Sequence, residues 1–175
     1  MLFVIDIGNS HTVTGLYDGD LLDDSLNRPA GDDTLHFEDR AAALLGDDSS
    51  FDGLAYIASY PDLIMAFGAN AAAGAAHFVN FGFAEGRGDG SFDGLQYIAS
   101  NADLIQAFGA NRDAGSLHFI NHGLAEGRMP DDFDAAQYLA NYADLRTAFG
   151  TDQEAATIHF ITYGFYEGRV DDMLA

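Results

Sequence analysis

Three stretches of this 175-residue chain repeat one another, and this repetition limits its fold more than any other feature. They begin at Phe51, Phe92 and Phe133, so the copies follow one another with a constant period of 41. The first two copies share 26 of 37 aligned residues without a gap. A period of about 20–50 residues is typical of stacked repeat proteins, in which one unit cannot bury its apolar side alone. The copies span residues 51–87, 92–128 and 133–169, within a predicted repeat domain at 51–175.

The start of each copy predicts a short helix. In the first copy, the carboxylate of Asp52 can accept a hydrogen bond from a free backbone N–H of the first turn. The flanking Phe51 and Tyr56 lie at the two positions of a hydrophobic staple. Residues of the same kinds stand at the same places in the other two copies.

Two further helices are predicted in each copy. Ser59, followed by Asp62 three residues later, indicates the start of a second helix. Asn70 indicates the start of a third, and Gly82 is expected to end it in a Schellman motif. The sequence therefore predicts a mainly α-helical, three-copy repeat array.

The first 46 residues differ from the repeats and form a predicted N-terminal segment. Alternating apolar residues and turn residues predict a small β-hairpin or meander. Its strands are expected at Leu2–Ile7, His11–Tyr17 and Leu21–Leu26, followed by a helix at Thr34–Leu45. Three short strands without a covering sheet leave an open edge, which could join two copies of the chain into a homo-oligomer.

The charge of the chain excludes some partners. The 28 acidic residues against 7 arginines, with no lysine, give a formal net charge of −21. Direct nucleic-acid binding is excluded because phosphates require cations, and anionic membrane surfaces are excluded for the same reason. With no cysteine, disulfides and thiolate metal sites are ruled out.

No stretch is apolar enough for a spanning helix, and the opening run that ends at Asp6 is too short for a signal-peptide core. We therefore expect no membrane insertion and no cleaved signal peptide. The compartment stays undetermined: export without a leader is open, and a cytoplasmic location is the alternative.

The pattern FDxxxYLAxxxDLxxAFG…HFxxxGxxEGR covers residues 51–169. It resembles tandem repeats of large secreted or surface-associated bacterial proteins, often found beside calcium-binding repeats. A similar version accompanies some bacterial glycosyltransferases. The resemblance implies an accessory helical module without assigned chemistry.

The opening sequence MLFVIDIGNSHTVTGLYDGD resembles the N-terminus of type III pantothenate kinase, of the actin, Hsp70 and sugar-kinase superfamily. In that resemblance Asp6 is the carboxylate near magnesium, and Gly8, Asn9 and Ser10 line the phosphate turn. The likeness covers only about 45 residues and lacks the family's later motifs. Phosphoryl transfer needs several converging elements, so we expect a truncated, kinase-like fragment without activity. The abrupt junction with the repeats is typical of a fusion, a truncated reading frame or an artificial chain.

Histidine, glutamate and arginine recur at fixed positions of the repeat. The histidines could be zinc ligands, but stacked helices about 8–10 Å apart hold equivalent residues too far from one metal ion, and a hydrogen-bonded structural role is favoured. The arginines are expected to bridge carboxylates of the same or the next copy, with an arginine row that binds a sugar acid as the alternative. His122 has no equivalent in the other copies and is given no role. The recurring residues are His77, His118, His159, Glu85, Glu126, Glu167, Arg87, Arg128 and Arg169.

The predicted function is a non-enzymatic interaction or structural module that contacts an unidentified protein or a glycan. We predict no resident cofactor, metal or catalytic residue. Two alternatives stay open: an acidic decoy that imitates nucleic acid and inhibits a basic protein, and an ATP- or phosphate-binding remnant of a pantothenate kinase-like protein.

Overall fold

The computed structural model describes residues 2–7, 11–16 and 51–172. The chain divides into two compact units, Met1–Asp39 and Arg40–Ala175. In the first unit, strands β1 (Leu2–Ile7) and β2 (His11–Leu16) pair in antiparallel register, with Asp6 opposite Thr12. The third predicted strand and the predicted helix at Thr34–Leu45 lie outside the described residues.

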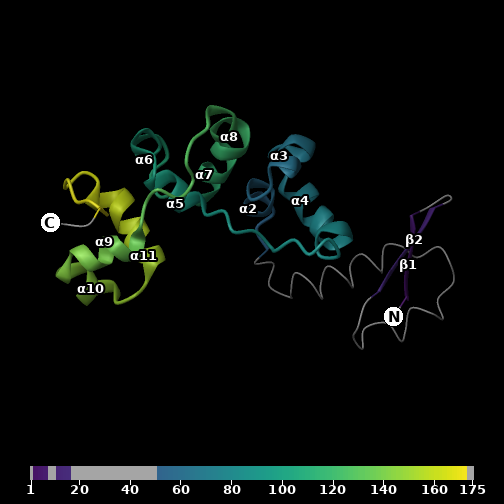
Figure 1. Ribbon diagram of the computed structural model, residues 1–175. Helices are drawn as coiled ribbons and strands as arrows, with labels where there is room; N and C mark the ends of the chain where they lie inside the picture. Colours follow the sequence, from purple (N-terminus) through teal and green to yellow (C-terminus); the bar gives the residue numbers. More distant parts are fainter. Residues whose placement is uncertain (1, 8–10, 17–50, 173–175) are drawn as a thin grey trace. The chain divides into compact units, whose positions relative to one another are not determined.

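The part of the chain from residue 51 to 172 is mainly helical, as predicted. Each of the segments 51–87, 92–128 and 133–169 contains three α-helices followed by one turn of π-helix (Figure 1). The first segment has α2 (Gly53–Ala58), α3 (Pro61–Phe67), α4 (Ala71–His77) and η3 (Phe78–Gly82). The second has α5 (Gly94–Ala99), α6 (Ala102–Phe108), α7 (Arg112–His118), η4 (Phe119–Gly123) and a further turn, α8 (Leu124–Glu126). The third has α9 (Ala135–Asn141), α10 (Ala143–Phe149), α11 (Gln153–His159) and η5 (Phe160–Gly164).

The predicted start of the first helix is confirmed. The Asp52 side chain accepts hydrogen bonds from the backbone N–H groups of Leu54 and Ala55, both at 2.9 Å. The rings of Phe51 and Tyr56 make the expected staple, with centroids 5.5 Å apart. Asp93 and Asp134 also cap α5 and α9, each accepting one backbone N–H, from Leu95 and from Gln137 respectively.

The predicted cap of the second helix is wrong. The residue before α3 is Tyr60, which makes no capping bond with its side chain. Ser59 instead ends α2, where its hydroxyl donates to the carbonyl of Ala55. The same hydroxyl accepts the backbone N–H groups of Ser91 and Phe92 at 2.9 Å, and so ties the joint between the copies to α2.

The predicted end of the third helix is correct in kind but comes four residues too early. Gly82 lies inside η3, and the chain continues to Gly86, which has a φ of 74°. The N–H of Gly86 donates to the carbonyl of Phe83, and the N–H of Arg87 donates to that of Gly82. These two bonds make the Schellman motif, with the left-handed conformation that glycine adopts without strain. Gly127 and Gly168 end their segments in the same way.

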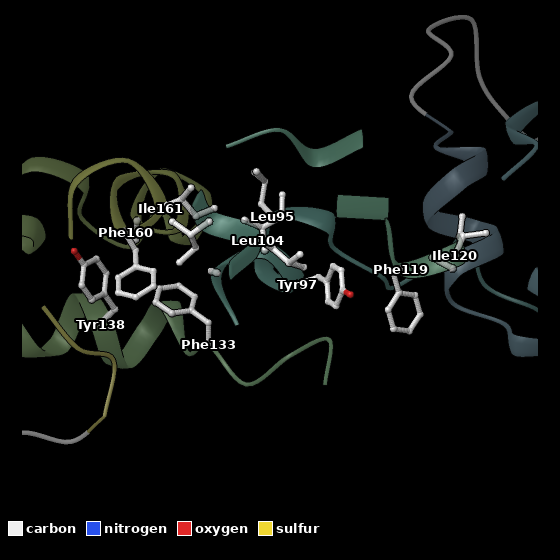
Figure 2. Packing of buried hydrophobic residues seen from close by; sticks show 14 of the residues in the cluster. Leu95, Tyr97, Leu104, Phe119, Ile120, Phe133, Tyr138, Phe160 and Ile161 are labelled. Atoms are coloured by element: carbon white, nitrogen blue, oxygen red, sulfur yellow. The ribbon is translucent and has the colours of Figure 1, made fainter. Parts of the chain in front are cut away.

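A tyrosine lies at the centre of each segment. Tyr56, Tyr97 and Tyr138 have no exposed surface. In the third segment, the rings of Phe133 and Phe160 stack with centroids 4.5 Å apart, and Tyr138 meets both (Figure 2). Aromatic pairs in such arrangements add about 0.5–1.5 kcal/mol beyond the area they bury.

Neighbouring segments pack through equivalent elements. Helix α2 contacts α7 and η4 of the second segment, and α5 contacts α11 and η5 of the third. At the second junction Leu95 of α5 is only 4% exposed and Ile161 of η5 only 1%. Burying a leucine or isoleucine side chain contributes roughly 1.5–3 kcal/mol, so these junctions stabilise the segments against separation.

Candidate functional site

The recurring histidine of each segment is hydrogen-bonded to the central tyrosine. His77 Nδ1 lies 2.9 Å from the hydroxyl of Tyr56, and the equivalent distances are 2.9 Å for His118 and Tyr97 and 3.0 Å for His159 and Tyr138. The predicted hydrogen bond is therefore present, and its partner comes from the first helix of the same segment. Burial raises the pKa of each of these three tyrosines to about 12.

The glycine of the π-helical turn makes room for this tyrosine. A Cβ on Gly82 would stand 2.2 Å from the hydroxyl oxygen of Tyr56. The π turn, in which the N–H of Phe83 donates to the carbonyl of Phe78, brings the bare backbone of Gly82 against that hydroxyl.

Each histidine also touches two other rings. His77 lies 5.4 Å from Phe67 and 5.7 Å from Phe81, measured between ring centroids. Phe81 is 51% exposed, and Tyr163, which takes its place in the third segment, is 58% exposed. In the second segment this exposed ring is His122, with its centroid 5.4 Å from that of His118.

The recurring arginine near the end of each segment forms ion pairs with two carboxylates. Arg87 donates from Nε to Glu85 at 2.7 Å and from Nη1 and Nη2 to both oxygens of Asp62, at 3.1 and 2.8 Å. Its guanidinium also lies 4.9 Å from the ring centroid of Tyr60. These bonds to Arg87 hold the pKa of Asp62 below its ordinary value. The bridge lies within one copy and does not reach the next.

The other copies repeat this arrangement with small changes. Arg128 pairs with Glu126 at 2.6 Å and with Asp103 at 2.8 Å. Arg169 pairs with Glu167 at 2.7 Å and with Asp144 at 2.9 Å, above the ring of Tyr142. Because internal carboxylates already bind these guanidinium groups, an external sugar acid would have to displace them.

Two partners of the recurring residues, Asp62 of the arginine and His122 of the histidine, were not predicted from the sequence. Asp62 was assigned to a helix cap, although an aspartate precedes the recurring arginine at the same spacing in all three copies. The i, i+4 spacing of His118 and His122 is also legible in the sequence, and it places both side chains on one face of a helix.

The residues of the kinase resemblance belong to the N-terminal part of the chain. Asp6 belongs to β1, in the other compact unit, and Gly8, Asn9 and Ser10 lie outside the described residues.

The described ranges contain neither a cluster of three metal ligands nor a membrane-spanning helix. No group of three or more histidine or acidic side chains there could hold a metal ion. None of the helices there is long and apolar enough to cross a membrane. Comparison with protein-family models, curated proteins and solved structures finds no match to this chain.

Proposed function

We propose that residues 51–169 form a three-copy helical repeat array, akin to those of exported or surface-associated bacterial proteins, that serves as a non-enzymatic binding module for a protein or a glycan. The observation that carries the proposal is one exposed ring at the same position of every copy. Phe81, His122 and Tyr163 each stand beside the half-buried histidine of their segment.

The placement of the ring supports a binding role. An exposed aromatic ring leaves apolar surface in contact with water, yet each copy has an exposed ring at this position. The exposed ring packs on one side against the recurring histidine, and Nδ1 of that histidine is hydrogen-bonded to the buried tyrosine. The exposed ring therefore loses little conformational freedom when a ligand stacks on it. Aromatic side chains of this kind are enriched where proteins bind partners.

The charged groups favour a module over an enzyme. The recurring arginines and their carboxylates form structural ion pairs inside each copy. Asp52, Asp93 and Asp134 cap helices. These acidic and guanidinium side chains are therefore engaged in structural contacts, which favours a binding module over an acid–base catalyst.

The test is binding of the whole chain to a panel of immobilised glycans and to candidate surface proteins. The triple variant Phe81→Ala, His122→Ala and Tyr163→Ala is expected to lose binding that the wild type shows. The variant Met65→Ala and Met129→Ala, which removes exposed apolar side chains elsewhere, is the matched control and is expected to bind normally. Equal binding by the triple variant would refute the role of the rings.

The acidic decoy is the rival proposal, and its motivation is the net charge of −21. A decoy holds a basic protein mainly by charge, so its complex should dissociate with modest salt, whereas ring stacking should persist. The kinase-remnant proposal predicts a rise in Tm with ATP and Mg²⁺ that Asp6→Ala abolishes.

A further inference from the structure

The second segment departs from the other two at one point beside its recurring histidine. His122 stands where the first segment has Phe81 and the third has Tyr163. The ring arrangement is nevertheless the same: the centroid distances are 5.4, 5.7 and 5.6 Å, and the interplanar angles are 54°, 46° and 48°. This substitution therefore places two imidazoles together on one face of the chain.

We propose that His118 and His122 together bind a divalent transition-metal ion such as Zn²⁺, with water completing its coordination. Histidines four residues apart on a helical face are a known metal-binding arrangement. A zinc–nitrogen distance of about 2.0–2.1 Å puts each imidazole centre about 3 Å from the ion, so two imidazoles at a tetrahedral angle have centres about 5 Å apart. The observed 5.4 Å is close to that value.

The surroundings of His118 prepare it as a ligand. Its Nδ1 lies 2.9 Å from the Tyr97 hydroxyl, and when Nδ1 donates to that oxygen, Nε2 keeps its lone pair for a metal. Burial, and then the charge of Arg128, lower the pKa of His118. A lower pKa favours the neutral imidazole, which is the form that binds a metal ion. His122 is exposed, which leaves the ion a path from solvent.

The charges near the pair come from three other side chains. Glu126 and Asp103 are acidic and attract a cation, whereas Arg128 opposes one. Arg128 is itself paired with both carboxylates, at 2.6 and 2.8 Å, which reduces its repulsion. These three side chains act on the ion only through their charge, and the imidazoles of His118 and His122 are its two protein ligands.

The repeat supplies matched variants for the test. His122→Phe gives the second segment the residue of the first, and Phe81→His gives the first segment a histidine pair. Both exchange rings at a position where all three side chains are accepted by the fold. If His122→Phe fails to fold, which circular dichroism would show, His122→Tyr uses the residue of the third segment instead.

The measurement is calorimetric titration of the whole chain with ZnCl₂ at pH 7.5, with MgCl₂ as the hard-cation control. We expect one saturable Zn²⁺ per wild-type chain, affinity at least about tenfold weaker in His122→Phe, and a second equivalent in Phe81→His. Wild-type affinity in His122→Phe would assign the ion to other groups and overturn the proposal. Absence of Zn²⁺ binding by the wild type, or an unchanged stoichiometry in Phe81→His, would overturn it as well.

Discussion

The hydroxyl oxygen of Tyr97 occupies the space that a side chain on Gly123 would need. A Cβ at residue 123 would stand 2.2 Å from that oxygen, and the hydroxyl is held in place by its bond to His118. We expect Gly123→Ala to lower the free energy of unfolding by about 1–3 kcal/mol or more, because a close-packed interior cannot yield without strain. Chemical denaturation checks this value.

A double-mutant cycle identifies the cause of that loss. Tyr97→Phe alone should cost about 1 kcal/mol through the lost hydrogen bond. In the Tyr97→Phe background, Gly123→Ala should cost less than in the wild type, because the oxygen that it strikes is gone. Additive costs would show that the hydroxyl is not the obstacle.

Ser116 is a buried side chain whose removal should stabilise the protein. It is fully buried, and its hydroxyl has no hydrogen-bond partner among the described residues. The first segment has Ala75 at this position. An unsatisfied buried hydroxyl costs about 1–3 kcal/mol, so Ser116→Ala should raise the Tm.

Thr157, the equivalent residue of the third segment, provides the control. Its hydroxyl donates to the Gln153 carbonyl at 2.8 Å. Thr157→Ala should therefore lower the Tm, in the opposite direction to Ser116→Ala. A fall in both variants would contradict our interpretation of Ser116.

The central tyrosines predict a loss of stability at alkaline pH. Burial raises the pKa of Tyr56, Tyr97 and Tyr138 from 10.0 to about 12. The unfolded chain loses these protons near pH 10, whereas the folded chain keeps them. Their contribution to stability is therefore complete below pH 10 and declines as the pH rises from 10 to about 12.

Tyrosinate absorbance and circular dichroism, recorded together, check this prediction. Three tyrosines per chain should ionise late and together with unfolding, and two in Tyr97→Phe. Ionisation of all eight tyrosines near pH 10 with the helices intact would contradict it.

One ion pair joins the second and third segments. Arg112 donates to Asp93 of its own segment at 2.7 Å and to Glu154 of the next at 2.8 Å. The Glu154 side chain is 64% exposed, so water and salt screen the pair.

We expect Arg112→Ala and Glu154→Ala to couple by at most about 1 kcal/mol in a thermal-denaturation cycle at low salt. The coupling should disappear in about 1 M NaCl, where the screening length is about 3 Å. A coupling that survives high salt would mean that the pair is far better shielded from solvent than its exposure indicates.

The starts of the first helices were predictable because they depend on residues that are close together in the sequence. Asp52 and Phe51 contact residues no more than five positions further along the chain, so a local rule finds them. Gly82 and Gly86 show where such a rule fails. Both glycines are able to end a helix, but only Gly86 does so. Gly82 instead lies against the hydroxyl of Tyr56, which comes from the first helix of the segment.

The charged partners were missed for the same reason. Asp62 and Arg87 are 25 residues apart in the sequence, and the Schellman turn at Gly86 precedes Arg87, which pairs with Asp62 at the start of α3. The pairing of His118 with His122 was within reach, because four-residue spacing is a local property.

The amino-acid sequence by itself determined the repeat period, the helical character and the starts of the first and third helices of each copy, because each can be recognised from residues close together or from simple recurrence along the chain. The tertiary structure alone decided which glycine ends the third helix, which carboxylate receives the arginine and which elements meet between segments. Those choices depend on the space and charge that distant residues bring to one place, and no local pattern contains that information.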